Sequence, residues 1–537
     1  MLSWLLLISV ACATGSSATT PSRTPPHIVF ILADDLGWAD TSLHGSAQIP
    51  TPNLDALAST GVLLNNYYVT PLGSPSRAAL MTGLYPANNG IRTSLLGAQA
   101  AGLPLDFKIL PEYLKDLGYE THIVGKWHLG YSSLNYTPTE RGFDTFYGYH
   151  NGPIDYYSGI MEQDGHSGLD FWNGTHSLHL EERIYSTTRF NEQAKSIIAN
   201  RNTSKPLFLY LAHQAVHSVY QPEFLQAPEE NLRKFHYIGD SNRTMLAGMV
   251  DALDQSIGDL IEELEKAGIL EDTILVFSTD NGGHPYTRTD PNSGFNWPLR
   301  GIKGTVWEGG IRATALIWSP RLEVSSRVSN QLMHISDWLP TLYSAAGGDV
   351  QKLGSLDGMD MWQALSTGAP SPRSEVLLEF DSNGERAALR YLNHKFLLGR
   401  YSEEASRRYE VRGGVSPSID LDMLQENSKV AGVLKRLYGK PDLFLHGFGE
   451  EWRRRGAVTC SDHGPSNFNW STGVFLFDLE SDPCELYNIA DREITILTDL
   501  FGKLSDYVTT LRAEVDKKID LRGYPENNNG TWAPWIF

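Results

Sequence analysis

Oxygen-bearing side chains that could bind a divalent cation come shortly after two apolar runs of the sequence. Asp34 and Asp35 follow the run at 27–32, and Asp280 and Asn281 follow the run at 273–277. Carboxylate and amide oxygens without a thiolate suit Ca²⁺ or Mg²⁺ better than Zn²⁺. Either pair alone is also typical of a turn or a helix cap. The four residues therefore predict a metal site only if the fold brings them together.

A second set of side chains is cationic or can exchange a proton. Cations beside a metal commonly hold a phosphoryl or sulfuryl group and stabilise the charge of its transition state. Each residue alone is equally typical of a solvated surface group or a structural histidine, so only their convergence would define a site. The set comprises Arg77, Lys126, His128, His217 and Lys303. His213 is interpreted as structural.

The elements that must position these groups are short β-branched or leucine-rich runs at 27–32, 121–124, 207–211 and 273–277. Their continuity indicates strands buried on both faces. Helical periodicity at 110–117 and 245–267 lies between them. This alternation predicts an α/β fold with a large, mostly parallel sheet sandwiched by helices. Ligands of such sheets bind outside the carboxyl ends of the strands, where the candidate residues are expected to meet.

The pattern changes after a turn-forming segment at 366–372. Strands predicted at 388–398 and 474–477, with a helix at 494–517, indicate a smaller C-terminal domain with an antiparallel sheet plus helix. A charged segment at 402–455 shows no clear pattern. We therefore predict a catalytic-type domain at 27–384 and a small domain at 385–537.

Composition limits the class of protein. The chain has 537 residues, of which 41% are hydrophobic and 20% charged, with a net charge of −19. It has enough apolar material for a sizeable core and is not typical of a disordered chain. The acidic balance argues against a broadly cationic nucleic-acid binder. Any anionic ligand must instead meet a local group of cations.

The N-terminus and the cysteines point to the secretory pathway. Residues 1–13 are interpreted as a cleaved signal peptide and 14–26 as a flexible N-terminus, and no stretch predicts a membrane anchor. Cys460 and Cys484 then remain as a pair that either forms a disulfide or stays free. Six Asn-x-Ser/Thr sites suit a secreted or lysosomal glycoprotein: Asn135, Asn173, Asn202, Asn242, Asn469 and Asn529.

The segment Gly73-Ser-Pro-Ser-Arg77 predicts the start of a helix, with Ser74 as the N-cap and Pro75 in the first turn. Residue 73 would then face a helix N-terminus, which favours anions.

Several motifs together resemble the sulfatase family of the alkaline-phosphatase superfamily, from about residue 27 to the last residues. In the family's order they are Ala33-Asp-Asp-Leu-Gly-Trp38, Pro75-Ser-Arg77, Gly125-Lys-Trp-His-Leu-Gly130, Arg141-Gly-Phe-Asp144, Asp280-Asn-Gly-Gly283, Leu299-Arg-Gly-Ile-Lys303, Trp307-Glu-Gly-Gly310 and Trp532-Ala-Pro-Trp535. The resemblance implies hydrolysis of sulfate esters, either aryl sulfates or sulfated glycosaminoglycan ends.

The resemblance also implies roles for the two sets of residues. It implies one Ca²⁺ per chain, bound by Asp34, Asp35, Asp280 and Asn281. Lys126 and Lys303 would hold the sulfate oxygens, and His217 would stand near the leaving-group oxygen as a proton donor. Arg77 and His128 would support the nucleophile.

The chain departs from the family at the nucleophile itself. The family's Cys-x-Pro-Ser-Arg signature begins with a residue that is converted to formylglycine, and this chain has Gly73 there. Glycine has no side-chain carbon to oxidise, so the covalent step cannot occur at this position. Loss of a nucleophile from a cooperating set of catalytic groups can cost about 10⁶ in rate, as it does in subtilisin.

Three interpretations follow. The chain is a binding protein that captures sulfated ligands without turnover, or it is a hydrolase of sulfate or phosphate esters that uses a metal-bound water, Ser74 or Ser76. Alternatively, Gly73 is an engineered change or a sequence error.

Overall fold

The computed structural model describes residues 24–537 except 221–223, 286–290, 382–384, 445–447, 461–466 and 471–472. The signal peptide predicted at 1–13 lies outside the described residues, as do most of the N-terminal segment 14–26 and the domain boundary predicted at 384.

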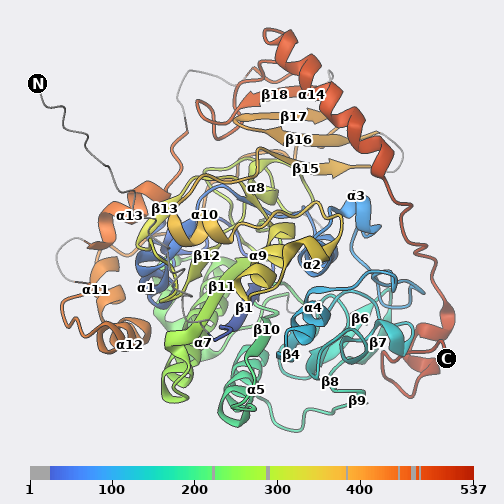
Figure 1. Cartoon of the computed structure of the whole chain (residues 1–537), viewed down its shortest axis with the longest axis vertical. Coiled ribbons are helices and arrows are strands. Elements are labelled where there is room, and N and C mark those ends of the chain that lie inside the picture. The colour runs from blue at the N-terminus through green and yellow to red at the C-terminus, as the bar shows by residue number, and fades with distance from the viewer. Residues whose placement is uncertain are drawn as a thin grey trace, which may run out of the picture.

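A ten-stranded mixed sheet forms the centre of the molecule (Figure 1), in the order β13-β2-β12-β11-β1-β10-β4-β5-β8-β9. Its central strands are parallel neighbours: β11 (Thr273–Thr279), β1 (His27–Ala33), β10 (Leu207–Ala212), β4 (Glu120–Lys126) and β5 (Thr145–Tyr149). The outer strands are β13 (Arg327–Ser329), β2 (Val62–Leu64), β12 (Leu316–Trp318), β8 (Trp172–Asn173) and β9 (His176–Ser177). The four apolar runs of the sequence are the strands β1, β4, β10 and β11, so the predicted α/β fold is confirmed.

Helices cover both faces of this sheet, which explains why its strands are apolar throughout. In β1, Val29, Ile31 and Ala33 belong to one buried cluster, and Ile28 and Phe30 belong to the other. The first cluster includes residues of α1 (Pro52–Thr60), α5 (Ser186–Asn200) and α7 (Ser241–Lys266). The second includes residues of α2 (Gly73–Thr82), α4 (Leu110–Asp116) and α9 (Trp338–Ala345).

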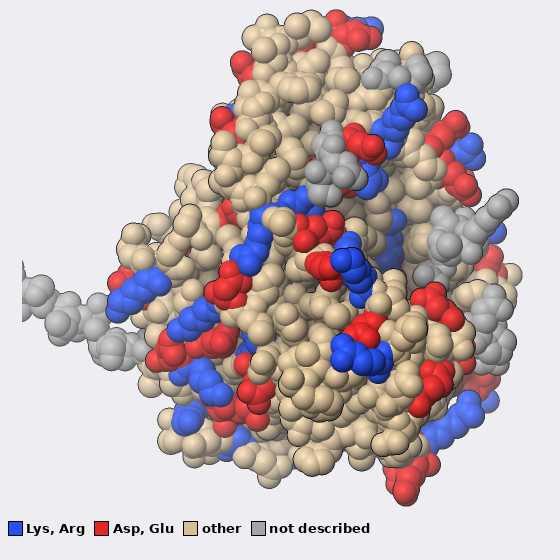
Figure 2. Space-filling view, turned by 90° about the vertical axis from the view of Figure 1, so that its right-hand side faces the viewer, with Lys and Arg blue, Asp and Glu red and all other residues tan. Residues whose placement is uncertain are grey.

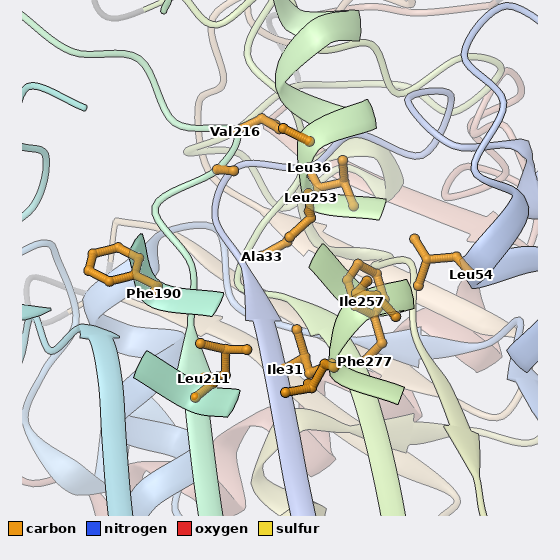
Figure 3. Packing of buried hydrophobic residues seen from close by; sticks show 14 of the residues in the cluster. Ile31, Ala33, Leu36, Leu54, Phe190, Leu211, Val216, Leu253, Ile257 and Phe277 are labelled. Atoms are coloured by element: carbon orange, nitrogen blue, oxygen red, sulfur yellow. The ribbon is translucent and has the colours of Figure 1, made fainter. Parts of the chain in front are cut away.

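Part of the first cluster lies close to the carboxyl ends of the strands. Figure 3 shows Ile31 and Ala33 of β1 near Phe190 of α5 and Leu253 and Ile257 of α7. Burying apolar area contributes roughly 25 cal/mol per Å². This packing fixes the strand ends from which the candidate residues extend.

The helix at residue 73 begins two residues earlier than predicted. Leu72, with φ of −138°, is the N-cap and Gly73 is the first residue of α2. The prediction of Ser74 as the N-cap is wrong, because its hydroxyl instead accepts a hydrogen bond from Leu95 N at 3.1 Å. Residue 73 nevertheless lies at the helix N-terminus, as expected.

A smaller antiparallel sheet contains β15 (Glu375–Phe380), β16 (Ala387–Tyr391), β17 (His394–Leu398) and β18 (Val474–Asp478) in that order. The helix α14 (Ile494–Tyr507) packs on it at the top of Figure 1. This confirms the small sheet plus helix.

The helix predicted to run to Lys517 ends earlier, followed by a 3-10 turn at Val508–Thr510. The chain then pairs with the large domain, where Arg512 N bonds to Ala87 O at 3.0 Å and Val515 N bonds to Gly90 O at 3.1 Å. Tertiary hydrogen bonds thus replace the continued helix.

The two sheets do not divide the chain into two consecutive halves. The strand β15 comes from before residue 384, whereas α11 (Leu421–Glu426), α12 (Lys429–Tyr438) and α13 (Phe448–Gly456) lie beside α1 on the large domain (Figure 1). The last residues also return to it, through bridges between Leu169 and Thr531 and between Ser133 and Ile536. The segment without a clear pattern at 402–455 therefore contributes helices to the larger unit.

Several surface features bear on the cellular compartment. Cys460 and Cys484 form a disulfide with a Cα–Cα distance of 5.5 Å. All six asparagines of the Asn-x-Ser/Thr sites are exposed. Within the described ranges, no helix has both the length and the apolarity needed to cross a membrane. Figure 2 shows basic and acidic side chains interspersed over one face of the molecule.

Candidate functional site

The predicted residues converge at the carboxyl ends of β1, β4, β10 and β11, which are neighbours in the large sheet. Asp34 and Asp35 follow β1, Lys126 ends β4, and Asp280 follows β11. His217 lies in the loop after β10, whose Val216 N bonds to Asp34 O at 2.7 Å. Parallel strands bring these groups to one edge although they are far apart in sequence.

Asp34 lies at the centre of a fully buried ion-pair network. Lys126 Nζ lies 2.6 Å from Asp34 Oδ2, and Arg77 Nη2 lies 3.7 Å from Asp34 Oδ1. Arg77 Nη2 also lies 2.8 Å from Asp280 Oδ2. All four side chains are at most 1% exposed. Burial of charge at this depth requires such pairing.

Asp35 forms the second half of the network. Lys303 Nζ lies 2.6 Å from its Oδ2, and Asn281 Nδ2 donates to its Oδ1 at 2.7 Å. His217 Nε2 lies 3.5 Å from Oδ2. Burial opposes ionisation of Asp35, but the charges of His217 and Lys303 hold its pKa below the usual range. Asp35 is thus an ionised carboxylate under ordinary conditions.

The donor set fits a hard divalent cation. Asp34 Oδ1 and Asn281 Oδ1 are buried and accept no hydrogen bond from the described residues. Buried oxygens without a donor are costly unless a cation or water satisfies them. Ligand atoms of Asp34, Asp35 and His217 all lie within 4.8 Å of one another. Asp280 Oδ1 approaches this group by accepting from Asp35 N at 3.2 Å.

The buried ion-pair network, which we call the cluster, has balanced charges without a metal. Asp34, Asp35 and Asp280 are matched by Arg77, Lys126 and Lys303, whose ammonium and guanidinium groups pair with them. Burial, followed by the Asp34 charge, raises the pKa of Asp280 to about 6. A divalent cation would give the cluster an excess of positive charge that suits an anionic ligand.

Gly73 faces this cluster. A Cβ at position 73 would lie 2.8 Å from Asp280 Oδ2 and 3.8 Å from His128 Nδ1. The glycine φ is not in the left-handed region that disfavours other residues. The backbone therefore does not require glycine here, and a side chain at residue 73 would project between the metal-type ligands and His128.

His128 presents a proton acceptor to residue 73. Its Nε2 lies 2.9 Å from Leu95 O, which can only accept, so the proton is on Nε2. Its Nδ1 is buried without a hydrogen-bond partner in the part of the chain that the structure describes. Burial, with the charges of Lys126 and Arg77, holds the pKa of His128 well below its usual value. The ring is therefore neutral, with a lone pair on Nδ1.

His217 differs from its predicted role in one respect. Its Nδ1 donates to Ser218 O at 2.5 Å, and its Nε2 accepts from Lys303 Nζ at 3.0 Å. Burial lowers the pKa of His217 to about 4 despite the neighbouring Asp35. In this arrangement Nε2 carries no proton, so His217 would donate one to a leaving group only after it is protonated.

Both alternative nucleophiles are engaged in hydrogen bonds. Ser74 Oγ accepts from Leu95 N at 3.1 Å. Ser76 Oγ donates to Asp280 O at 2.5 Å and accepts from Thr70 N at 2.9 Å. Both hydroxyls thus serve the local fold, which weighs against the serine alternative.

Two further residues lie next to these groups. His213 is buried, with Nε2 3.5 Å from Ser256 Oγ of α7, in keeping with a structural role. Asn292, which the sequence did not single out, donates from Nδ2 to Asp35 O at 2.8 Å and to Val216 O at 3.1 Å. It lies in a loop without periodicity or a recognised motif, so no sequence signal identified it.

Comparisons with known proteins identify the family of this chain. Residues 26–348 match the family model described as Sulfatase. The chain is 36% identical to Arylsulfatase J of Mus musculus over 529 residues, which cover 96% of this chain and 81% of that protein. It is 33% identical to N-acetylgalactosamine-6-sulfatase of Canis lupus familiaris over 387 residues, which cover 69% and 71%.

The fold agrees with a solved structure described as Ps i-CgsB in complex with k-i-k-neocarrahexaose. That structure has a TM-score of 0.70 and 26% identity, covering 93% of this chain and 96% of that one. The protein therefore has the α/β fold of a family whose members hydrolyse sulfate esters. The chain belongs to the sulfatase family.

Proposed function

We propose that this chain binds sulfated ligands at the cluster and has lost, or nearly lost, the family's turnover. The observation that carries the proposal is Gly73, which occupies the position facing Asp280 and His128 but offers no side-chain atom for covalent catalysis. The surrounding cations and carboxylates are all in place.

Binding would use the groups that catalysis would otherwise use. Lys126 and Lys303 would hold sulfate oxygens, and Arg77 would keep Asp280 in place. Asp34, Asp35, Asp280 and Asn281 would hold one Ca²⁺. When bound, this cation would supply positive charge for an anionic ligand. His217, 8% exposed, connects the cluster with the surface.

The part of the ligand beyond its sulfate would enter a cavity beside His217. This cavity of about 600 Å³ is lined by residues that include Tyr157, Val219 and Tyr220. Tyr156, between the lining residues Asp155 and Tyr157, connects this cavity with the site, because its OH donates to His217 O at 2.9 Å. A sugar or aryl group would fit there. The sequence motifs resemble arylsulfatase B, the N-acetylgalactosamine-4-sulfatase, and we propose a ligand of that type.

We also propose that the protein enters the secretory pathway and is secreted or lysosomal. The apolar N-terminal segment, the disulfide and the exposed Asn-x-Ser/Thr asparagines support this proposal.

The test compares the wild type with Gly73→Cys, both co-expressed with the formylglycine-generating enzyme. We expect both proteins to be retained on a sulfated-glycan resin and only the variant to release the alcohol of a chromogenic aryl sulfate. Comparable turnover by the wild type would contradict the proposal, as would failure of the wild type to bind the resin.

One observation favours slow hydrolysis as a second function. The Nδ1 of His128, which bonds to none of the described residues, lies 3.8 Å from the position that a Cβ of residue 73 would take. A water molecule there could lose a proton to His128 and attack the sulfate or phosphate ester. If so, wild-type turnover would be measurable and His128→Ala would abolish it without changing retention on the resin.

A further inference from the structure

The loop that carries Lys303 is attached on both sides of the lysine to segments that connect the elements of the C-terminal part of the chain. Before it, Arg300 Nε donates to Glu485 O at 2.9 Å and Arg300 Nη1 donates to Ser406 O at 2.9 Å. After it, Glu308 N donates to Glu485 Oε2 at 2.8 Å. Glu485 therefore holds the two ends of a short loop whose centre reaches Asp35 and His217.

A buried ion-pair cluster fixes Glu485 in turn. Lys395 Nζ, from β17, lies 2.7 Å from Glu485 Oε1 and 2.9 Å from Glu308 Oε1. All three side chains are 0% exposed. Glu308 Oε2 also accepts from Tyr68 OH at 2.7 Å. Buried groups paired in this way have little freedom to move, because each displacement would leave a charge without a partner.

The backbone of Glu485 indicates that the surrounding fold holds this residue. Its φ is +55°, a left-handed conformation that glutamate adopts rarely. The residue follows Cys484, which the disulfide ties to Cys460. Arg300 is also stacked on Phe468, with its guanidinium carbon 4.0 Å from the ring centroid. These contacts all lie outside the site of the proposed sulfate binding.

Lys303 lies between these two points of attachment. Its ammonium is at once 2.6 Å from Asp35 Oδ2 and 3.0 Å from His217 Nε2. Its own loop contacts the large domain through backbone bonds of Lys303 N to Gly283 O and Gly304 N to Pro71 O. A shift of the loop of about 1 Å is enough to weaken binding or catalysis strongly.

We propose that Lys395 of the small sheet and Glu485 of the loop after β18 are positioning residues for Lys303, and that the small sheet with this loop thereby completes the sulfate site. The inference rests on the proposed function, because it assumes that Lys303 binds sulfate. It assigns to the C-terminal unit a role in binding rather than in stability alone.

The test is a double-mutant cycle measured by titration calorimetry with inorganic sulfate, below the lowest Tm of the variants. We expect Glu485→Ala to weaken sulfate binding about tenfold, and Lys303→Ala to weaken it by a similar factor. In the Lys303→Ala background, Glu485→Ala should cause no further loss. Glu485→Gln, which keeps an acceptor for Glu308 N, should stay within about twofold of the wild type.

Asp337→Ala is the matched control. Asp337 is also fully buried and paired with a cation, Arg373, but its carboxylate serves Arg373, Met359 and His334 instead of the Lys303 loop. It should lower Tm and leave the Kd for sulfate unchanged. An unchanged Kd in Glu485→Ala, or losses that multiply with Lys303→Ala, would overturn the inference.

A second variant and a second measurement cover the cases in which the first experiment fails. If Glu485→Ala does not fold, Arg300→Lys takes its place, because it removes the donors to Glu485 and Ser406 while keeping the charge. If the wild type binds no sulfate, the proposed function fails, and the inference is judged by acetylation of Lys303, which is 15% exposed. Faster acetylation in the Glu485 or Arg300 variant, but not in Asp337→Ala, supports the positioning role, and equal rates refute it.

Discussion

At the scale of single residues, Gly73 is the position on which the proposed loss of turnover rests. Its backbone does not need glycine, and a Cβ there would point into the cluster at 2.8 Å from Asp280 Oδ2. Only small movement of that carboxylate is needed to admit a side chain. The absence of a nucleophile is therefore a property of one residue and not of the surrounding fold.

A second prediction at the scale of single residues concerns the buried histidine His150. His150 lies among Tyr131, Phe146 and Trp172, and neither ring nitrogen has a hydrogen-bond partner among the described residues. Burial lowers its pKa to about 3. Its folded pKa is below its unfolded value of about 6.5, so the unfolded state binds more protons and stability falls as the pH drops between these values.

His150→Phe removes this titration and should reduce the loss of stability in acid. Each pH unit below about 6.5 is worth about 1.4 kcal/mol, so from pH 7 to 5 the variant should gain about 2 kcal/mol relative to the wild type. Urea unfolding at the two pH values measures this difference. A parallel decline of both proteins would show that His150 does not cause the acid sensitivity.

The sequence predicted which residues form the site better than it predicted the protonation states of these residues. Asp34, Lys126 and Asp280 could be found because each ends or follows a strand that hydrophobicity reveals. The proton positions of His128 and His217 could not, because they depend on Leu95 O and Ser218 O. Such partners come from loops, which carry no periodic signal.

At the scale of elements, a hydroxyl joins α2 to the end of β11 at the site, next to the ion pair of Arg77 with Asp280. Ser76 Oγ, from the first turn of α2, donates to Asp280 O at 2.5 Å and accepts from Thr70 N. This bond holds the helix N-terminus and Gly73 against the end of β11. The helix and the metal-type ligands are therefore positioned together.

We expect the substitution Ser76→Ala to loosen the contact between the N-terminus of α2 and the end of β11. It leaves Thr70 N without its acceptor in a buried place, which costs about 1–3 kcal/mol. Denaturant unfolding measures the loss, and sulfate titration should show weaker binding because residue 73 and Asp280 shift. Ser344→Ala, on the partly exposed end of α9, is the control and should change neither quantity. Full stability in Ser76→Ala would contradict the role of this bond.

Some helices and strands could be predicted from the sequence and others could not. The central strands were predictable because burial on both faces makes them continuously apolar. The end of α14 was not, because Arg512 and Val515 bond to Ala87 and Gly90 of the large domain. The helices α11–α13 were missed because their sequence is highly charged, although Arg453 is buried in pairs with Asp55 and Asp422.

At the scale of the whole molecule, a bound cation should stabilise the fold. The cluster joins residues that follow β1 and β11 with Lys303 from a distant loop. A ligand that binds only the folded state adds about 2.7 kcal/mol at a concentration 100-fold above its Kd. Calorimetry should show a higher Tm with Ca²⁺ than with EDTA, and Asp34→Asn should remove the difference. Equal Tm values in the wild type would refute the metal site.

The last prediction concerns the disulfide, which links the segment after α13 to the loop after β18. It closes a loop with a sequence separation of 24 residues. The entropy of such a loop gives about 3 kcal/mol of stability. Cys484 also precedes Glu485, which holds the ends of the Lys303 loop.

The double variant Cys460→Ser and Cys484→Ser should therefore lose stability and sulfate affinity together, although neither cysteine touches the cluster. Unfolding in urea and titration with sulfate measure the two effects, with Asp337→Ala as a variant that loses stability alone. Loss of stability with unchanged sulfate affinity would mean that the disulfide braces the small sheet without reaching Lys303. A combined loss would show that the site needs both units of the chain, because the large sheet supplies the carboxylates and the small sheet keeps one of their cations in place.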